Sequence, residues 1–242
     1  MMTAHLARAL LIAGLFVSSV PPALADSLTR AEVLGLIEKA SGAGKAVDLS
    51  RRDLAGLDLS GIDFRGADLF AALLEGSNLR GVKLAGANLN RAIMRNADLS
   101  GADLSDASLY AVVLNGATLK GANLSSARII GEMREVNASG AKFTGADLGA
   151  DATNQGMVPV RVDLSRAILD GADFSGANLT HAVLVYADLR SAILTGARLN
   201  WAKMSGANLV GADVANADFS DAELDDAKLG DVKGAATAKG LP

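Results

Sequence analysis

ADLSG, at residues 97–101, is one copy of a five-residue pattern that recurs from about Val47 to about Asp231. Its order is a small, a polar, a large apolar, a polar and a small residue, and the fourth residue is apolar in some copies, such as ADLFA at 67–71 and ANLVG at 207–211. Residues five apart lie about 140° apart on an α-helix, and strand side chains alternate between two faces. Neither element can keep the central leucines in one core. The chain must therefore turn about once per repeat, so that the central Leu and the Ala two residues earlier face a common axis.

The outward position before the central Leu indicates how many repeats complete one turn of this solenoid. The position is usually Asp or Asn, but it is apolar at Leu73, Ile93 and Val113, which are spaced by twenty residues. A turn of three repeats would instead align Leu73 with Asn88. Because apolar neighbours on adjacent turns can cover one another, a turn of four repeats is favoured. The sequence therefore predicts an all-β solenoid with four sides.

The A-[DN]-L-x-x pattern resembles that of the pentapeptide-repeat family, and the resemblance covers roughly three quarters of the chain. Copies that carry it are ANL at 87–89, ADL at 102–104, ADF at 172–174, ADL at 187–189 and ADF at 217–219. The resemblance implies a right-handed quadrilateral β-helix, which over residues 47–231 would have about nine coils. It implies little about activity, because one fold can carry unrelated functions.

Residues 26–46 leave the five-residue rhythm and predict a capping α-helix followed by a linker. Thr29 and Glu32 form a capping-box pattern for a helix N-terminus. The apolar face of this helix would consist of Val33, Leu36, Ile37 and Ala40. We expect the helix to cover the first coil, which would otherwise expose its core and unpaired backbone; a partner-binding helix is the alternative. Residues 232–242 contain few large apolar groups and predict a flexible C-terminal tail.

Residues 1–25 predict a bacterial secretory signal peptide. Arg8 supplies a positive charge, residues 9–20 are apolar and uncharged, and ALA at 23–25 fits the small-x-small cleavage rule. The apolar run is short for a membrane span, although an uncleaved anchor is the alternative. Cleavage would start the mature chain at Asp26, in the periplasm or outside the cell, with no transmembrane segment. The chain has no cysteine, so it can form no disulfide and no thiolate metal site.

One interruption breaks the rhythm of the repeats. A residue is lost between Ile129 and Met133, and one is regained before Leu164. Residues at about 149–163 have lost the Ala/Leu pattern, and Pro159 excludes regular ladder pairing there. We expect an irregular loop that bulges from one corner. Protruding loops often carry function, and a tolerated insertion is the alternative.

No catalytic site is expected. His5 lies in the predicted signal peptide, which leaves His181 as the one histidine of the mature chain. A Ser-His-Asp site needs a nucleophile, a base and an orienting acid that converge in a pocket, and a rod filled with Leu offers none. In the twenty-residue register one surface column reads Arg161, His181, Trp201 and Asp221. This column is a weak candidate for a ligand contact through its aromatic face, and a covered surface column is the alternative.

Outward Asp and Asn residues form columns that resemble cation sites, for example Asp48, Asp68 and Asn88. Calcium takes about six to eight oxygen ligands around one point, whereas a flat ladder places its oxygens along a line. Alternation of Asp with Asn lowers like-charge repulsion within a column. The sequence therefore predicts structural ladders, with no metal site and no cofactor.

An outward apolar stripe is the candidate protein-contact patch. Its members are Phe70, Leu73, Ile93, Tyr110, Val113 and Ile130. Val112, which lies among them, is expected to point inward. A contiguous exposed apolar surface indicates a contact site, and the alternative is that the preceding helix or the irregular loop covers it. A free stripe would bind another exported protein or form a homodimer.

Two functions remain. The favoured one is an exported, non-catalytic module that binds or scaffolds proteins in the cell envelope. The other follows from a resemblance to the quinolone-resistance members of the family, which mimic DNA and bind gyrase. Loss of the one cation of the signal peptide, Arg8, would change the net charge from −4 to −5. Basic residues such as Lys83, Arg128, Arg198 and Lys203 dilute the acidic columns, and export would separate the protein from gyrase. Direct nucleic-acid binding is not expected, because the sequence shows no basic stripe with interleaved aromatic residues.

Overall fold

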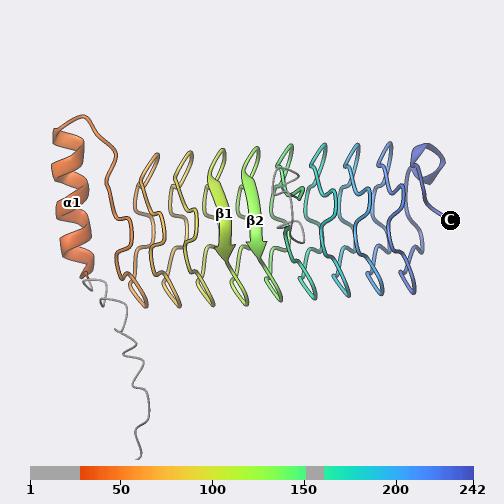
Figure 1. Ribbon diagram of the computed structural model, residues 1–242, viewed down its shortest axis with the longest axis horizontal. Helices are drawn as coiled ribbons and strands as arrows, with labels where there is room; N and C mark the ends of the chain where they lie inside the picture. Colours follow the sequence, from red (N-terminus) through yellow and green to blue (C-terminus); the bar gives the residue numbers. More distant parts are fainter. Residues whose placement is uncertain (1–27, 151–160) are drawn as a thin grey trace, which may run out of the picture.

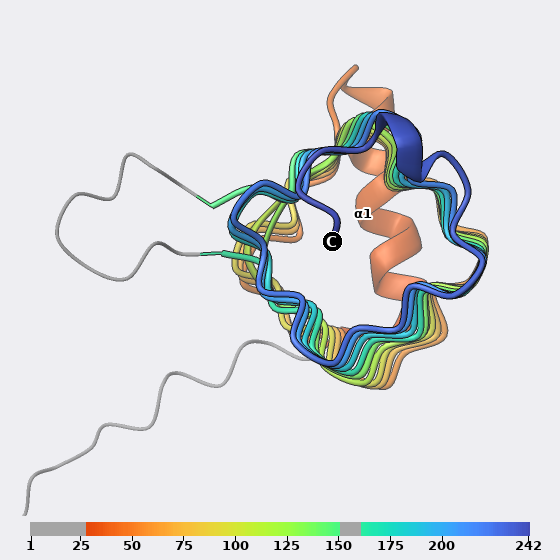
Figure 2. The same cartoon turned by 90° about the vertical axis from the view of Figure 1, so that its right-hand side faces the viewer.

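The computed structural model describes residues 28–150 and 161–242. The predicted signal peptide, residues 1–25, lies outside the described residues, as do residues 151–160 of the predicted irregular loop. The described chain forms a helix followed by a rod of stacked turns (Figure 1). The turns lie in register around one axis when the rod is viewed from its end (Figure 2).

The rod has four faces, each of which contributes one residue per turn to a parallel bridge with the next turn. Most bridged partners are twenty residues apart, which confirms the four-sided turn. We name the faces A to D by these outward residues. Face A runs through Asp48, Asp68, Asn88, Ser108, Arg128, Asp147, Asn178, Arg198, Asp218 and Lys239, and face B through Asp53, Leu73, Ile93, Val113, Glu132, Asp163, Val183, Lys203 and Glu223. Face C starts at Asp58 and face D at Asp63.

The nine successive pairings along face A mark nine turns, numbered 1 to 9 from Asp48. An edge is the corner between two faces and consists of the second and third residues after each outward residue. Edge AB thus includes Phe70 and Ala71 after Asp68, and edge BC includes Glu75 and Gly76 after Leu73.

Regular strands are short because each side of a turn ends at a corner. β1, Ser108–Val113, pairs in parallel with β2, Arg128–Glu132. On the other sides within the described residues the contact is an isolated bridge. Corners place a residue in the left-handed region, for example Gly101 at φ 65°. A repeat of five residues therefore supplies one short extended side and one corner.

The sequence predicts that one turn is a residue shorter than the others, and the structure places this shortening in the pair of strands β1 and β2. The register shifts between Tyr110 and Val112, so Val113 pairs with Glu132, nineteen residues later (132 − 113). At Gly131 (φ 144°), an added Cβ would lie 2.1 Å from the carbonyl oxygen of Val112. No other residue type fits such a close approach of two backbones. This glycine allows the shortened turn to stay in the stack.

The core consists of the central residue of each repeat and the small residue two positions earlier. Leu99, Leu104 and Val112 are fully buried, as expected for inward positions. Phe143 and Phe174 lie one above the other, with ring centroids 4.6 Å apart and an angle of 4° between the planes. Each turn therefore packs on its neighbours through one continuous apolar column.

The outward Asp and Asn residues close the corners. Asp98 Oδ1 accepts a hydrogen bond from the backbone N–H of Ser100 at 3.0 Å, and equivalent contacts recur along the chain. Between turns an Asn donates to an Asp, as where Asn88 Nδ2 lies 2.9 Å from Asp68 Oδ1. The columns are therefore structural ladders. Asp or Asn is favoured at the outward position because its side chain accepts from the corner N–H, and Asn can also donate to an Asp of the neighbouring turn.

These hydrogen bonds make the stability of the rod depend on pH. Donation from the side chain and backbone of Ser50 lowers the pKa of Asp48, and donation from Arg190 lowers the pKa of Asp188. Burial raises the pKa of Asp163, but hydrogen bonds from Ser165 and Arg134 outweigh it, so the net direction is downward.

We expect the melting temperature to fall as the pH drops below about 4. A lowered folded-state pKa gives stability that is present above the unfolded-state pKa, about 3.9 for Asp, and is lost as the pH falls through the folded-state pKa. Thermal unfolding monitored by circular dichroism between pH 7 and pH 2 measures this. Asp163→Asn should show a shallower dependence, because its side chain does not titrate. A melting temperature that stays constant down to pH 2 would contradict this account.

α1, Arg30–Gly42, covers turn 1 and confirms the predicted capping helix (Figure 2). The capping box is formed: the Thr29 side chain accepts from the N–H of Glu32, and Glu32 Oε2 accepts from the N–H of Thr29 at 2.7 Å. Val33 is fully buried against the core. Around it pack Leu28, Leu36, Ile37 and Ala40. Within the two described ranges, no helix has the length and apolar character needed to cross a membrane.

The C-terminal end corrects one prediction. The sequence predicts a flexible tail at 232–242, whereas these residues continue the stack. In the 3₁₀ turn η1, Ala235–Thr237, the Thr237 hydroxyl accepts a backbone N–H from the preceding turn at 3.0 Å. The carbonyl of Lys239 then accepts from the N–H of Phe219 at 2.8 Å. The five-residue pattern misses this segment because backbone hydrogen bonds, and few large side chains, hold it in place.

Candidate functional site

The surface aromatic residues gather on one side of the rod. Within the described residues, four aromatic side chains lie outside the buried core: Phe70, Tyr110 and Trp201 on edge AB, and Tyr186 on edge BC. Both edges border face B. Trp201 is 51% exposed and Tyr186 is 64% exposed. Because aromatic side chains are enriched in protein–protein contacts, we take face B and its two edges as the candidate functional site.

Face B carries the apolar stripe that the sequence predicts. Leu73, Ile93 and Val113 bridge one another in consecutive turns, and each is partly exposed. After two acidic positions, the stripe resumes at Val183. Phe70 and Tyr110, also partly exposed, lie beside it on edge AB. The structure thus brings together five of the six residues of the predicted patch.

Ile130, the sixth residue, corrects the predicted patch because it is fully buried. It pairs with Tyr110 of β1 on one side. On the other side, Arg128 donates to the carbonyl oxygens of Asp147 and Gly149 at 3.1 and 2.8 Å, which holds the next turn close. Ile130 is enclosed between neighbouring turns and offers no surface to a partner.

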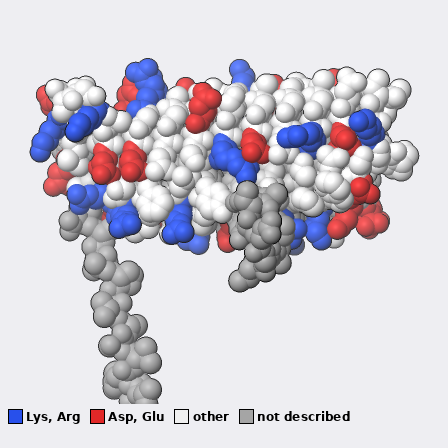
Figure 3. Space-filling model, turned by 45° about the horizontal axis from the view of Figure 1, so that its top comes forward, with Lys and Arg blue, Asp and Glu red and all other residues white. Residues whose placement is uncertain are grey.

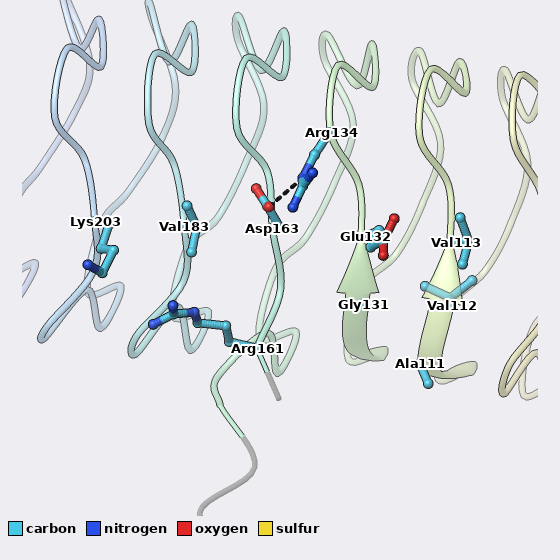
Figure 4. Close-up of a pocket in the computed structure, with 10 residues that line it drawn as sticks. All are labelled: Ala111, Val112, Val113, Gly131, Glu132, Arg134, Arg161, Asp163, Val183 and Lys203. Atoms are coloured by element: carbon cyan, nitrogen blue, oxygen red, sulfur yellow. Dashed lines mark hydrogen bonds and ion pairs between the residues drawn. The ribbon is translucent and has the colours of Figure 1, made fainter. Parts of the chain in front are cut away.

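A groove of about 510 Å³ crosses face B beside the stripe (Figure 4). Its lining on this face consists of Val113, Glu132, Asp163, Val183 and Lys203. Arg134 Nε donates to Asp163 Oδ2 at 2.6 Å and so pairs one of the two acidic groups. Arg161 makes no hydrogen bond or ion pair with the described residues, and its side chain extends towards the turn of Val183 (Figure 4). The groove can therefore take an apolar group that has an anionic neighbour.

The second predicted cluster lies on edge AB in turns 6 to 9. The rings of His181 and Trp201 stack with centroids 5.1 Å apart and 14° between their planes. Arg161 and Asp221 occupy the same edge, one turn before His181 and one turn after Trp201. Within the described residues no carboxylate hydrogen-bonds to the His181 ring, so nothing there orients it as a general base. Nor does any group of three or more His, Asp or Glu side chains in this part of the chain converge on a possible metal position.

One sequence-based expectation about the surface was wrong. The sequence analysis finds no basic stripe with interleaved aromatic residues, yet in turns 1 to 4 edge AB carries in order Arg51, Phe70, Arg91 and Tyr110. The guanidinium carbons of Arg51 and Arg91 lie 5.8 and 5.9 Å from the Phe70 ring centroid, within cation–π range. With two cations held against it, the Phe70 ring is poorly placed to stack on a nucleic-acid base.

Tyr186 and the two arginines are the site residues that the five-residue pattern does not single out. Tyr186 lies three residues after Val183 of face B, so the twenty-residue register places it on edge BC. Arg51 and Arg91 likewise fall on edge AB, twenty residues before and after Ala71. The sequence does contain the spacing that places these three residues beside face B. That spacing becomes evident only when every surface side chain is assigned to a face or an edge.

Comparison with known proteins gives one family and several similar solved structures. The family model described as pentapeptide repeats matches the chain in eight copies, at residues 45–81, 72–110, 102–131, 160–196 and 197–233. HetL, a pentapeptide repeat protein involved in heterocyst differentiation regulation from the cyanobacterium Nostoc sp. strain PCC 7120, is 29% identical, with 85% of this chain and 94% of HetL covered and a TM-score of 0.38. Full-length QnrB1, a plasmid-mediated fluoroquinolone resistance protein, is 22% identical, with 75% of this chain and 92% of QnrB1 covered and a TM-score of 0.49. No curated protein matches the chain.

Proposed function

This chain belongs to the pentapeptide-repeat family, and from that premise we propose that it is an exported, non-catalytic module that binds or scaffolds proteins in the cell envelope. Proteins of this family form right-handed quadrilateral β-helices and are generally non-catalytic structural modules. The descriptions of HetL and QnrB1 concern regulation and drug resistance, which differ from each other. The function of this chain therefore has to be inferred from its own surface residues.

The observation that carries the proposal is the concentration of aromatic, arginine and aliphatic side chains on face B and its edges. Tyr, Trp and Arg are the residues most enriched among binding hot spots. Phe70 and Trp201 lie on edge AB, Tyr186 lies on edge BC, and Ile93 lies on the face between these edges. Faces C and D show no comparable set among the described residues: their large apolar outward residues are the isolated Ile168 and Ile193.

Export rests on residues 1–25, whose charged start, apolar stretch and small-x-small end have the order of a secretory signal. An exported protein without cysteine cannot use disulfides, so its stability has to come from the stacked core. A rigid rod held together in this way suits a scaffold, because its contact residues stay fixed relative to one another. The mature protein would start at Asp26.

The acidic residues support a DNA-mimic role less well. Asp98 pairs with Arg80 at 3.0 Å and Asp147 with Arg128 at 3.2 Å, so basic side chains neutralise part of the ladders. Asn residues separate many of the remaining carboxylates along the same columns. DNA mimicry needs an extended array of free negative charge, as the phosphate backbone presents.

A crosslinking experiment in intact cells tests the proposal. A photo-crosslinking amino acid at position 93 on face B should form an adduct in the envelope or secreted fraction, on a chain that starts at Asp26. The same amino acid at position 193 is the matched control, because Ile193 is an outward Ile, 40% exposed, on face D. Ile93→Asp should prevent adduct formation from a neighbouring face-B position such as 73, because a charge would replace an apolar contact. The proposed function would be contradicted if positions 93 and 193 gave equal amounts of adduct, or if the protein were cytoplasmic and retained residues 1–25.

A further inference from the structure

The pairing between the inner turns shows what a turn offers to its successor. On face B, the N–H of Met204 donates to the carbonyl of Glu223 in turn 9 at 2.8 Å, and the N–H of Glu223 donates back to the carbonyl of Ala202 at 2.9 Å. At the next corner, the N–H of Gly206 donates to the carbonyl of Asp225 at 2.8 Å. Each side of a turn therefore offers two N–H groups and one carbonyl to the turn that follows it.

Turn 9 has no following turn on faces B and C within the described residues. Its backbone groups on these two sides form no hydrogen bond with the next part of the described chain: the N–H groups of Leu224, Asp226, Leu229 and Asp231, and the carbonyls of Ala222 and Ala227. The chain instead continues from Lys233 on face D to Lys239 on face A, and its end turns in over the axis of the rod (Figure 2). Two adjoining sides of the sheet thus have an open edge.

The core is also incompletely covered at this end, because Leu224 and Leu229 are partly exposed. At the N-terminal end, by contrast, the N–H of Leu28 donates to the carbonyl of Asp53 at 3.1 Å, and α1 covers the core so that Leu54 is fully buried. The chain itself thus supplies backbone pairing and apolar cover to turn 1. Faces B and C of turn 9 lack both.

We propose that the open edge of turn 9 on faces B and C binds an extended segment of another protein, which adds to the rod as a further part-turn. An extended backbone matches this edge because it can offer two carbonyls and one N–H to each side, in the parallel register of the turns below. Two large apolar residues of the segment, five positions apart, would then lie over Leu224 and Leu229. This contact is separate from the proposed protein contact at face B and does not rest on it.

Charge complementarity specifies the outward residues of this segment. Lys203 and Glu223, which are neighbours on face B, form an ion pair at 3.2 Å, so opposite charges attract between successive turns here. The residue above Glu223 is therefore expected to be Lys or Arg, and the residue five positions later, above Lys228, to be Asp or Glu. With small and large apolar residues inward, as in the rod itself, the segment reads Ala, basic, Leu, two corner residues, Ala, acidic, Leu.

The corner between these two sides adds to the preference for a basic segment. Asp225 and Asp226 lie there, and neither forms an ion pair with the described residues. Figure 3 shows acidic side chains gathered at this end of the rod, opposite α1. A second copy placed end to end would bring two such acidic corners together, and this like-charge contact disfavours it as the occupant.

Amide hydrogen exchange, followed by NMR on the full chain, tests the inference with the synthetic peptide AKLRGAELSG. Exchange at Leu224, Asp226 and Leu229 should slow by about tenfold when the peptide is present at about ten times its dissociation constant. The peptide AELRGAKLSG, whose two outward charges are exchanged, should bind about threefold or more weakly. The inference is overturned if these amides do not slow at up to about 2 mM peptide, or if both peptides bind equally. Slow exchange without peptide that increases with protein concentration would also overturn it, because a second copy would then occupy the edge.

A charge reversal on the rod places the peptide on this edge. Lys228→Glu should bind AKLRGAELSG about threefold or more weakly and should instead prefer AKLRGAKLSG. Lys120→Glu is the matched control, because Lys120 is exposed on the edge between faces C and D in the middle of the rod and, like Lys228, has no ion-pair partner among the described residues. It should bind both peptides like the wild type, and equal melting temperatures would show that both variants fold.

Unchanged affinities in Lys228→Glu would overturn the inference, because the peptide would then lie elsewhere. Such a failure would leave the proposed function of face B standing, since the crosslink at position 93 probes a different surface.

Discussion

Leu104→Asp is expected to leave the rod unfolded at room temperature, so that no cooperative thermal transition is observed. Leu104 is fully buried in turn 3, with turns stacked on both sides of it, and its N–H donates to the carbonyl of Asn123 in the next turn at 2.7 Å. Removal of a buried Leu side chain costs about 2–5 kcal/mol, and an unpaired carboxylate in the same space adds a desolvation cost. The sum, about 5 kcal/mol or more, is comparable with the whole stability of a typical domain.

The matched control is the neighbouring residue on the outside of the same repeat. Asp103 Oδ1 accepts from the N–H of Ser105 at 3.2 Å and from Asn123 Nδ2 at 3.0 Å. Asp103→Asn keeps an amide oxygen for these donors, so the melting temperature should change by no more than a few degrees. Thermal unfolding by circular dichroism measures both variants. Similar losses at positions 103 and 104 would contradict the assignment of inward and outward positions.

Much of this fold follows from the sequence, because one short-range rule repeats along the chain. Spacing alone aligned Leu73, Ile93 and Val113, and the structure bridges these three residues in consecutive turns. The capping box at Thr29 is equally local, since its contacts span three residues. Rules of this kind need no knowledge of distant parts of the chain. The four-sided turn and the N-terminal helix were predictable for that reason.

The incorrect expectations concern residues whose environment depends on a neighbouring turn. Ile130 has the spacing of an outward residue, but β1 and the following turn enclose it. The tail after Val232 has few apolar side chains, yet backbone groups of the preceding turn hold it. The stripe of Arg51 and Phe70 depends on side-chain contacts between turns. The residues of a single repeat do not indicate such contacts, because the contacts form between neighbouring turns.

The ends of the rod limit its stability, because an end turn has a neighbour on one side only. At the N-terminal end, α1 replaces the missing neighbour of turn 1 (Figure 1). At the C-terminal end, the residues after Lys233 serve this role less completely, and Leu224 and Leu229 remain partly exposed. Damage to the N-terminal cap would therefore expose a second unprotected end and leave both open to pairing with other chains.

Val33→Asp is accordingly expected to detach α1 and to make the protein aggregate. Val33 is fully buried against turn 1, and a buried carboxylate there would cost about 3 kcal/mol or more. Detachment also exposes Leu36 and Ile37, which contribute about 1.5–3 kcal/mol each when fully buried. Leu34→Asp is the matched control, because Leu34 is the next residue of the same helix and is 44% exposed. Light scattering during a thermal ramp should rise earlier for Val33→Asp alone, and amide exchange should increase first in turn 1. If both variants scatter at the wild-type temperature, α1 does not protect the end of the rod, and turn 1 must be stable without it.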